Sequence, residues 1–367
     1  MNRTTLIVIL VLLVVVFATI CILLKVYRKP YDIILFGYHC DQMAYVLRKQ
    51  GNRTKIVKGH WRNHLDLFKN SSLKAVWISW NFLPFDFSIL QPSTRVNYVS
   101  CMRGWGNKTN ALSRLYGSKV KCPPTLLLYP DSIDKVKKEH FPPKPWILKP
   151  CCAGKAKDTI LPTSIEEILN HVKTKPYSSF VCQTLVEPLL IDNCKFHVRI
   201  EVAIDHLHNA YLYDNSEVAL SGSPYSPENY SSVITNFAVQ RKVHGDKVAH
   251  ALWKIQKQFP QINRLKSKWI NLVIHFVGRV FELSPLSKSN QASFQFFGID
   301  VMFDNEENAI FLESNIDTYL KEETNEGKMR MADCLDGLYR RVFKDSPTDF
   351  TDWIQLYRHG LLVYTQV

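Results

Sequence analysis

Two strand-like stretches carry the side chains whose types and spacing could do chemistry. Residues 195–202 alternate Lys, His, Arg and Glu with Phe, Val, Ile and Val, so a strand here would place every charged or polar group on one face. Residues 298–303 form a second run, and the turn residues at 304–308 separate it from a third run at 309–315. The second and third runs therefore predict a β-hairpin.

The predicted hairpin would bring three hard oxygen ligands together. Asp300 lies on one arm, whereas Glu313 and Asn315 lie on the other and share a face because they are two residues apart. Mg²⁺ prefers such oxygens when it also binds water and phosphate. The alternative is the solvated face of a half-buried sheet, where alternating charges are common. Against it, Asp300 interrupts an apolar run, and a buried carboxylate is costly unless a partner or a metal satisfies it.

A lysine-bearing loop precedes these stretches. Residues 146–149 predict a strand that ends in Lys149, and residues 150–157 read Pro-Cys-Cys-Ala-Gly-Lys-Ala-Lys. Backbone N–H groups and lysine side chains in such a loop can both face an anion, which makes it a candidate phosphate cradle. The loop lacks Walker A spacing, and the chain has no Gly-x-Gly-x-x-Gly motif, so an ordinary surface loop is the alternative. The order of parts favours a site for a nucleoside triphosphate and Mg²⁺ between two sheets.

Other patterns predict the elements that must position these groups. Ser164 and Glu167 have the spacing of a capping box and open a predicted helix that ends near residue 173. Prolines within residues 120–145 predict connections between short elements. Strands are predicted at 31–37, 74–80 and 179–186 and near Thr159, and helices at 42–49, 246–259 and 328–343.

The composition predicts a globular protein with an acidic partner. Hydrophobic residues make up 46% of the 367 residues, which is enough for a sizeable core. The net charge of +13 favours nucleic acid, anionic lipid or an acidic protein tail as a partner. Nucleic acid is not expected, because the positive charge is dispersed and no recognition motif or zinc-finger spacing accompanies it.

The N-terminal segment predicts a membrane anchor. Residues 6–24 contain no charged side chain and reach about the length that spans a bilayer core. Lys25, Arg28 and Lys29 follow directly and favour a single-pass protein whose large C-terminal part lies in the cytosol. A cleaved signal peptide is the alternative, although no small-residue cleavage site follows the run cleanly.

A lumenal location of the C-terminal part is the other possibility for its topology. Glycosylation sequons would then become acceptors, but such triplets are common by chance. The cysteines do not decide the side, because Cys21 lies in the apolar segment and the other eight form no recognisable disulfide framework. The sequons begin at Asn52, Asn70, Asn107 and Asn229.

The chain resembles the tubulin–tyrosine ligase-like family, whose members are ATP-grasp enzymes. The resemblance extends from about residue 96 to residue 340, and the matching stretches occur in the family's order and spacing. They are Trp-Ile-Leu-Lys-Pro at 146–150, residues 181–190, Lys-Phe-His-Val-Arg at 195–199, Ile-Thr-Asn at 234–236, residues 296–302 and Phe-Leu-Glu-Ser-Asn at 311–315.

The resemblance implies an α+β fold of the ATP-grasp type, in which two sheet-containing subdomains hold the nucleotide. A small α/β domain would precede the catalytic domain, and one transmembrane helix would precede both. The expected parts are a membrane anchor at 1–30, the small domain at 31–95, the catalytic domain at 96–345 and a tail at 346–367.

The implied activity is an ATP-dependent ligase. With ATP and Mg²⁺, it would activate a protein carboxylate as an acyl phosphate and join it to the amine of a free amino acid. The protein substrate would be tubulin or another acidic-tailed protein, modified by glutamate, glycine or tyrosine. The alternative function is a catalytically impaired relative that acts as a membrane-anchored binding protein.

The resemblance also implies a nucleotide site on the matching positions. Two lysines would hold phosphates, two loop residues would lie over them, and four consecutive residues would line the adenine site. Lys108 matches the family's N-terminal active-site lysine on a looser alignment. The other residues are, in that order, Lys149 and Lys195, Gly154 and Lys155, and Gln183, Thr184, Leu185 and Val186, with Thr235 and Asn236 also beside the nucleotide.

The remaining implied roles concern the metal, the chemistry and the amino acid. Asp300, Glu313 and Asn315 would hold Mg²⁺. Arg199 would steady the charge that develops during phosphoryl and acyl transfer, and His197 lies beside it in the catalytic motif. On a looser alignment, Lys328 would bind the amino acid.

The chain departs from the family pattern mainly where the amino acid would bind. His197 replaces the aspartate of the Lys-Phe-Asp-x-Arg motif. Ala219 stands where glutamate-adding members usually carry an arginine, and residues 215–222 are altered throughout. No proline follows Asn315, where many members have one. The departures leave the identity of the amino acid, and activity itself, open.

Overall fold

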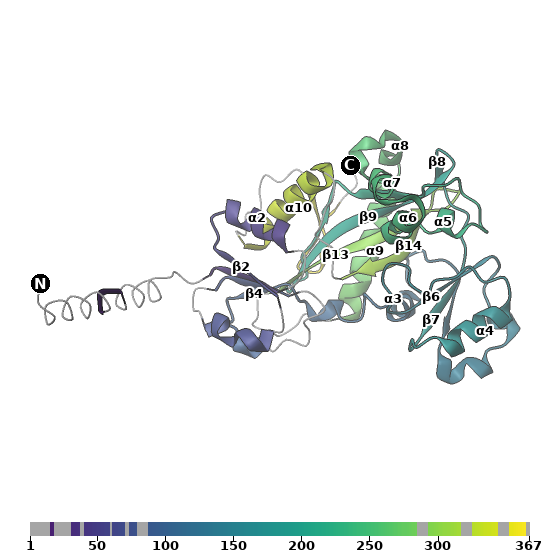
Figure 1. The fold of residues 1–367 in the computed structure, drawn as a ribbon, viewed down its shortest axis with the longest axis horizontal. Helices are drawn as coiled ribbons and strands as arrows, with labels where there is room; N and C mark the ends of the chain where they lie inside the picture. Colours follow the sequence, from purple (N-terminus) through teal and green to yellow (C-terminus); the bar gives the residue numbers. More distant parts are fainter. Residues whose placement is uncertain are drawn as a thin grey trace, which may run out of the picture.

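The fold is α+β, as predicted, and the residues that the structure describes form three sheets. Figure 1 shows them in a row, with a parallel sheet on the N-terminal side, a large central sheet, and a small sheet at the far end. The computed structural model describes residues 15–17, 31–36, 40–58, 61–69, 73–78, 87–284, 293–316, 325–343 and 352–364.

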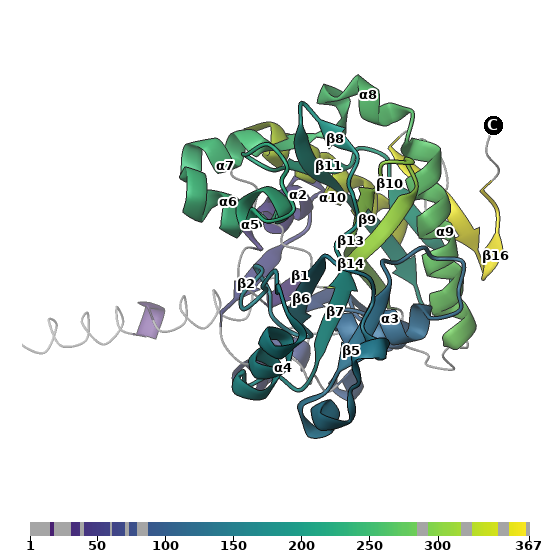
Figure 2. The same cartoon turned by 90° about the vertical axis from the view of Figure 1, so that its right-hand side faces the viewer.

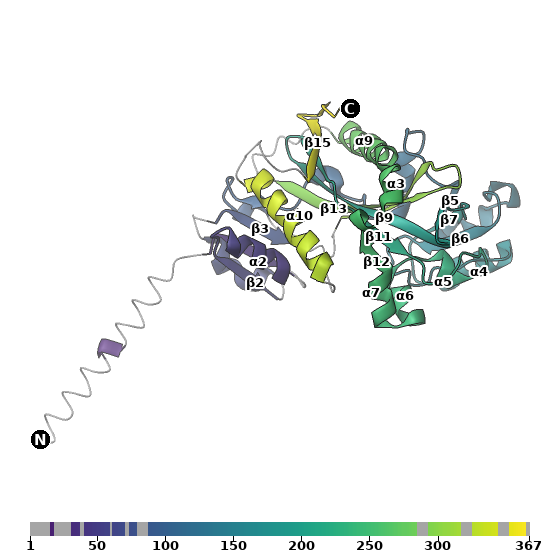
Figure 3. The ribbon, with the colours of Figure 1, turned by 90° about the horizontal axis from the view of Figure 1, so that it is seen from above.

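The N-terminal sheet is parallel and its inner strands are buried. Strand β1 reads Ile-Ile-Leu-Phe, an apolar run that is typical of strands covered on both faces. Helices α2 (Asp41–Lys49) and α10 (Asn325–Phe343) contact each other beside this sheet, as Figure 3 shows. The strand order is β2 (Thr54–Val57), β1 (Ile33–Phe36), β3 (Ala75–Ile78) and β4 (Arg95–Val96).

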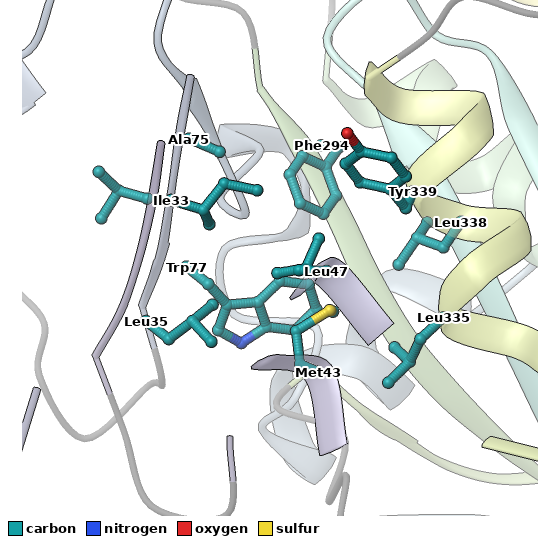
Figure 4. A pocket seen from close by; sticks show the side chains of 11 residues that line it. Ile33, Leu35, Met43, Leu47, Ala75, Trp77, Phe294, Leu335, Leu338 and Tyr339 are labelled. Carbon is teal, nitrogen blue, oxygen red and sulfur yellow. The ribbon is translucent and has the colours of Figure 1, made fainter. Parts of the chain in front are cut away.

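Helix α10 therefore joins the end of the chain to the N-terminal sheet. The expectation of a helix at 328–343 is confirmed, and the helix begins at Asn325. Figure 4 shows Leu335 of this helix, Trp77 of β3 and Phe294 of the central sheet around one apolar pocket. Its volume is about 10 Å³, about enough for one water molecule, and its lining is apolar. The pocket is a packing gap in the core and does not qualify as a ligand site.

The central sheet is antiparallel around a long middle strand, β9. Strand β9 pairs with β11 and β10 at different parts of its length on one side and with β13 on the other, and β13 also pairs with β14. The predicted hairpin is thus confirmed. The strands are β8 (Leu190–Ile191), β9 (Cys194–Asp205), β10 (Ala210–Tyr213), β11 (Glu217–Leu220), β12 (Trp253–Ile255), β13 (Phe294–Phe303), β14 (Ala309–Asn315), β15 (Trp353–Arg358) and β16 (Leu361–Leu362).

Both faces of β9 are buried. Its apolar face joins the main core, which includes α9 (Lys266–Leu283) beside the sheet in Figure 2. Each fully buried large apolar side chain there contributes about 1.5–3 kcal/mol. The polar face is also covered, since His197 is 5% exposed and Glu201 is 0% exposed. The interpretation as a solvated face is therefore wrong, because other elements pack over the charged side chains.

The small sheet is antiparallel and packs on one helix. Ser164 caps α4 (Ile165–Thr174) by accepting a hydrogen bond from the Glu167 backbone N–H. The Glu167 carboxylate accepts from Thr163 and not from Ser164, so only half of the predicted capping box forms. The strand expected near Thr159 is a single bridge between Ile160 and Leu148. The strand order is β5 (Thr125–Leu128), β7 (Phe180–Thr184) and β6 (Trp146–Pro150).

The helix expected at 246–259 is wrong in its second half. Helix α7 (Asp246–Leu252) ends before Trp253, and residues 253–255 become the edge strand β12 because they pair with β11. The remaining α-helices are α3 (Lys108–Leu115), α5 (Tyr230–Val233), α6 (Phe237–His244) and α8 (Pro260–Asn263). The 3₁₀ segments are Trp61–Lys69, Phe87–Ile89, Ser100–Met102, Pro130–Lys135, Lys138–His140 and Gln256–Gln258.

The predicted localisation as a single-pass membrane protein is contradicted. Across the parts of the chain that the structure describes, no helix combines the length and the apolar character needed to cross a bilayer. Of the expected span at 6–24, residues 15–17 are described and helical, and the others lie outside the described residues. The boundaries of the predicted domains stay predictions.

Candidate active site

Three neighbouring strands align an arginine and two carboxylates on one face of the central sheet. Arg199 of β9 lies opposite Asp300 of β13, and Asp300 lies opposite Glu313 of β14. Residues in register on paired strands project to the same side, so the three side chains share one face. The structure thus places the cationic strand β9 directly beside the carboxylate hairpin of β13 and β14.

Arg199 and Asp300 form a two-pronged ion pair. Arg199 Nε and Nη2 donate to the two Asp300 carboxylate oxygens, each at 2.8 Å. Asn315 Nδ2 donates to Asp300 Oδ2 at 3.2 Å. Burial lowers the pKa of Arg199, but the attraction of Asp300 outweighs burial and raises that pKa overall. The pair fixes the arginine's plane and keeps it charged.

Glu313 forms a second ion pair with Lys108, beside the first. Lys108 is the first residue of α3, and its Nζ lies 3.1 Å from Glu313 Oε2 and 3.2 Å from the Ala153 carbonyl oxygen. Burial alone would raise the pKa of Glu313, but the attraction of Lys108, Lys149 and Arg199 lowers it to about 2. Glu313 is therefore ionised at any physiological pH.

Two further lysines lie near these pairs and lack a carboxylate of their own in the described contacts. Lys149 Nζ donates to Gln183 Oε1 at 3.0 Å, and Lys195 Nζ donates to the Val233 carbonyl at 2.9 Å. Burial lowers the pKa of Lys149 to about 8 despite the attraction of Glu313. Burial and the repulsion of Lys149 lower the pKa of Lys195 to about 7. An anion bound between the two lysines would restore their full charge.

His197 lies between Lys195 and Arg199 along β9 and is neutral. Its Nδ1 lies 2.6 Å from Thr235 Oγ1. Burial lowers the pKa of His197, and the attraction of Asp300 only partly offsets it. Within the described residues, the other ring nitrogen, Nε2, is buried without a hydrogen-bond partner. A ligand group that reached it would meet an unsatisfied polar atom.

Trp253 covers this part of the face and was missed in the sequence. Its ring centroid lies 5.8 Å from that of His197, and the Arg199 guanidinium carbon lies 5.5 Å from its ring. Its indole N–H donates to Glu217 Oε2 at 2.9 Å. Trp253 also lies opposite Ala219 in register. The expected helix at 246–259 hid Trp253, because only its position in β12 points it at β9.

Arg330 of α10 was also missed, and it forms a cluster with two carboxylates farther along the face. Arg330 Nη1 donates to Glu217 Oε1 at 2.9 Å, and Nη2 donates to Glu201. Its Nε donates to the Asn215 carbonyl at 2.6 Å. The Arg330 side chain is 1% exposed. The sequence held a signal, since Arg330 falls at helical spacing with the buried Met331, Cys334, Leu335 and Leu338.

Several predicted residues lie at the edges of the cluster. Gly154 and Lys155 are exposed in the loop after β6, and Lys328 is exposed on α10, outside the described contacts of the cluster. Asn236 accepts from the Ala238 N–H and so caps α6. The three residues after Gln183 make local contacts. Thr184 Oγ1 donates to the Pro143 carbonyl, Leu185 belongs to a small apolar cluster, and Val186 is half-buried.

The donor types fit Mg²⁺. Among the described residues, no group of three or more His, Cys, Asp or Glu side chains could hold a metal ion. The candidate set instead offers the carboxylates of Asp300 and Glu313 with the amide of Asn315. Mg²⁺ is commonly bound by one or two carboxylates together with phosphate oxygens and waters, so such a set is sufficient when a nucleotide is bound.

The comparisons with known proteins point to one family. A model of the tubulin-tyrosine ligase family matches residues 116–349. Tubulin glycylase 3D of Tetrahymena thermophila is 22% identical over 254 residues, which are 64% of this chain and 23% of that protein. Tubulin glycylase 3F of the same organism is 24% identical over 202 residues, 47% of this chain and 21% of that protein. The chain thus spans less than a quarter of the length of these relatives.

Proposed function

The chain belongs to the tubulin-tyrosine ligase family, and from that premise we propose that it is an ATP-dependent carboxylate–amine ligase. Membership implies an ATP-grasp-like α+β fold, which agrees with the mixture of sheets and helices. The observation that carries the proposal is the presence of two ion pairs on the central sheet, Arg199 with Asp300 and Lys108 with Glu313. They lie close to the half-buried Lys149 and the buried Lys195.

We propose that ATP binds between the small sheet and the central sheet. Lys149 and Lys195 come from these two sheets, and their lowered pKa values are those of cations that lack an anion. The phosphates of ATP would supply it. Gly154 and Lys155 would lie over the phosphates, and the other positions in the proposed nucleotide site are Lys108, Gln183, Thr184, Leu185, Val186, Thr235 and Asn236.

The proposed metal site is the end of the hairpin. Asp300, Glu313 and Asn315 would hold Mg²⁺, and Glu313 is already ionised for that role. When bound, ATP and Mg²⁺ would supply the activation of a protein carboxylate as an acyl phosphate, and an amine that attacks the acyl carbon would then form the amide and release phosphate. The chain's own contribution is to hold these groups in place before the reaction.

Arg199 and His197 are the proposed catalytic residues. Asp300 fixes the Arg199 guanidinium by two hydrogen bonds, so the positive charge is in place when negative charge develops on the transferred groups. His197 is neutral, and its Nδ1 is hydrogen-bonded to Thr235 Oγ1. Its other nitrogen is available to accept a hydrogen bond from the incoming amine, where the family has an aspartate.

The proposed protein substrate is tubulin or another protein with an acidic tail. The net charge of +13 would steer such a tail toward the chain. The relatives are named for tubulin glycylation, so glycine is the first amino acid to test. Glutamate and tyrosine are the others, and Lys328 stays the predicted contact for the free amino acid.

The test is a transfer assay with the full chain. Purified protein is incubated with Mg-ATP, tubulin and labelled glycine, glutamate or tyrosine in parallel, with Asp300→Ala as the control. We expect one label to enter tubulin with the unmutated protein only. If no label enters and Mg-ATP does not raise the melting temperature, the ligase proposal is wrong.

A second candidate is a relative that binds nucleotide without transferring an amino acid. The specific observation in its favour is Trp253, which lies opposite Ala219 and covers this face near Arg199. Ala219 is the position at which glutamate-adding members would carry an arginine. A rise of the melting temperature with Mg-ATP, together with no label transfer from any of the three amino acids, would favour this candidate over the ligase.

A further inference from the structure

Two adjacent cysteines lie where the basic loop leaves the small sheet. Strand β6 ends at Pro150, so Cys151 and Cys152 directly follow the strand that carries Lys149. Their sulfur atoms are 3.0 Å apart. Cys151 is buried, whereas Cys152 is the exposed one among the cysteines that the structure describes. An oxidant in solution can therefore reach this pair.

The surroundings of Cys151 differ from those of its neighbour Cys152 and of Cys122. Burial raises the pKa of the Cys151 thiol, but hydrogen bonds with Ser179, Cys152 and Ser178 outweigh burial and lower it overall. By contrast, burial raises the pKa of the Cys122 thiol to about 12. Burial and the neighbouring Cys151 raise the pKa of the Cys152 thiol to about 11, so Cys151 is the member of the pair that is favoured as thiolate. Thiolates react with oxidants and disulfides faster than thiols do.

The pair also contacts the first turn of α3, which carries Lys108. The Lys108 backbone N–H donates to the Cys151 carbonyl at 3.2 Å, and Lys108 Nζ donates to the Ala153 carbonyl at 3.2 Å. Asn107, which caps α3, donates from Nδ2 to Cys152 Sγ at 3.1 Å. Because Lys108 is the partner of Glu313, a movement of this turn would reach the candidate metal site.

We propose that Cys151 and Cys152 form a reversible dithiol switch, whose oxidation to a disulfide displaces Lys108 and weakens nucleotide binding. The effect on nucleotide binding rests on the proposed function. With hydrogen peroxide as oxidant, the two sulfurs give up two electrons, an S–S bond forms, and the O–O bond breaks. The two thiol protons end in the two water molecules that the peroxide becomes.

Ring closure must move the backbone. Consecutive Cα atoms lie 3.8 Å apart across a trans peptide, whereas disulfides usually span about 4.4–6.8 Å between Cα atoms. The peptide between Cys151 and Cys152 therefore has to rearrange, and its carbonyl is the one that accepts from the Lys108 N–H. A bond formed under such strain is easily reduced, which makes the change reversible by a small thiol.

The test compares reduced protein with protein treated with hydrogen peroxide and then with catalase. Peptide mass spectrometry measures the internal disulfide as a loss of two hydrogens, hydrogen exchange measures the amides at 107–111, and melting curves report Mg-ATP binding. We expect oxidation to form the disulfide, speed exchange at 107–111 and weaken Mg-ATP binding about tenfold or more, and we expect dithiothreitol to reverse all three effects.

Two variants make the test specific. Cys152→Ser should abolish all three effects of peroxide, whereas the matched control Cys122→Ser, at a half-buried thiol outside the loop, should respond like the unmutated protein. If no disulfide joins the pair, or if exchange at 107–111 is unchanged when it does, the switch is refuted. If reduced protein fails to bind Mg-ATP, the proposed function fails, and the disulfide and exchange measurements still decide the switch.

Discussion

Two arginines on one face of the central sheet pair with carboxylates in very different surroundings. The side chains of Arg199 and Asp300 are 18% and 7% exposed, and those of Lys108 and Glu313 nearby are 18% and 28% exposed. The Arg330 side chain is 1% exposed and pairs with Glu201 at 0% and Glu217 at 6%. The difference teaches that residue types alone do not define a site, since only the first cluster is open enough to admit a ligand.

The two clusters also differ in how their charges balance. In the first, Arg199 and Lys108 face Asp300 and Glu313, and the pKa of Glu313 falls to about 2 because its cations outweigh burial. In the second, one arginine serves two carboxylates. Burial and the neighbouring Glu217 raise the pKa of Glu201 to about 7 although Arg330 opposes them. In the first cluster Glu313 is therefore ionised and can bind a metal ion. The second cluster, Arg330 with Glu201 and Glu217, acts as a clamp, because its ion pairs hold α10 against the central sheet.

The largest expected effect comes from removing the clamp. We expect Arg330→Met to lower the free energy of unfolding by about 3–5 kcal/mol, because two buried carboxylates lose their shared cation. Urea denaturation followed by circular dichroism measures the loss. The matched control is Arg340→Met on the same helix, whose half-exposed ion pair with Asp336 is worth about 1 kcal/mol or less.

A rescue variant separates lost charge balance from lost packing. When Glu201→Gln and Glu217→Gln accompany Arg330→Met, no unpaired buried charge remains, and most of the lost stability should return. If Arg330→Met alone costs no more than Arg340→Met, the second cluster is not a clamp and the contrast between the two arginines collapses.

The open cluster, formed by Arg199, Asp300, Lys108 and Glu313, should lose activity rather than stability when its arginine is replaced. Arg199→Lys keeps the positive charge but loses the fork that grips both Asp300 oxygens. We expect the rate of label transfer to tubulin to fall about 100-fold or more, as for the loss of one preorganised donor at developing charge. The free energy of unfolding should fall by less than for Arg330→Met. Transfer kinetics and urea denaturation on the same preparation measure both quantities.

One result for Arg199→Lys would contradict the proposed catalytic role of Arg199. If Arg199→Lys destabilises the chain as much as Arg330→Met does while the transfer rate per folded molecule is unchanged, Arg199 is structural and not catalytic. As a control for the hairpin, Glu306→Gln changes an exposed turn carboxylate and should leave both quantities near those of the unmutated protein.

Local patterns were sufficient to predict the strands that carry most of the open cluster. The alternation at 195–202 predicts β9 and its polar face, and the turn residues at 304–308 predict the hairpin of β13 and β14. They could not predict that Arg199 meets Asp300, because that register joins strands about one hundred residues apart. Nor could they predict the cover over the face, since it comes from α10 and β12 through tertiary packing.

The errors have a common physical cause, which is tertiary structure overriding local spacing. The helical spacing at 246–259 continues past Leu252, but pairing with β11 makes Trp253 part of a strand. Arg330 differs, because local spacing alone would have been enough to find it. The helical spacing places it on the apolar face of α10, and a buried arginine without a partner is costly. A charged residue on an apolar helical face therefore predicts buried partners elsewhere in the chain.

The most gradual expected effect is the pH dependence of the free energy of unfolding. The folded pKa of Glu201, about 7, lies above its ordinary value of 4.5, so between these values the folded chain holds a proton that the unfolded chain releases. This group's stabilisation is complete below pH 4.5 and decreases as pH rises to 7, by about 3 kcal/mol for a shift of this size. Glu313 has the opposite shift, and its contribution is complete above pH 4.5 and is lost only as pH falls toward 2.

Comparing variants isolates the effect of Glu201. Burial lowers the pKa of His197, His208 and His275, which makes stability rise with pH near neutrality and opposes the Glu201 slope. The quantity to compare is therefore the difference in unfolding free energy between unmutated protein and Glu201→Gln, measured in urea from pH 5 to 8. This difference should change with pH for Glu201→Gln and stay constant for Glu313→Gln. Equal pH dependence in the two variants would show that the carboxylates occupy equivalent electrostatic surroundings, contrary to the comparison of the two arginines.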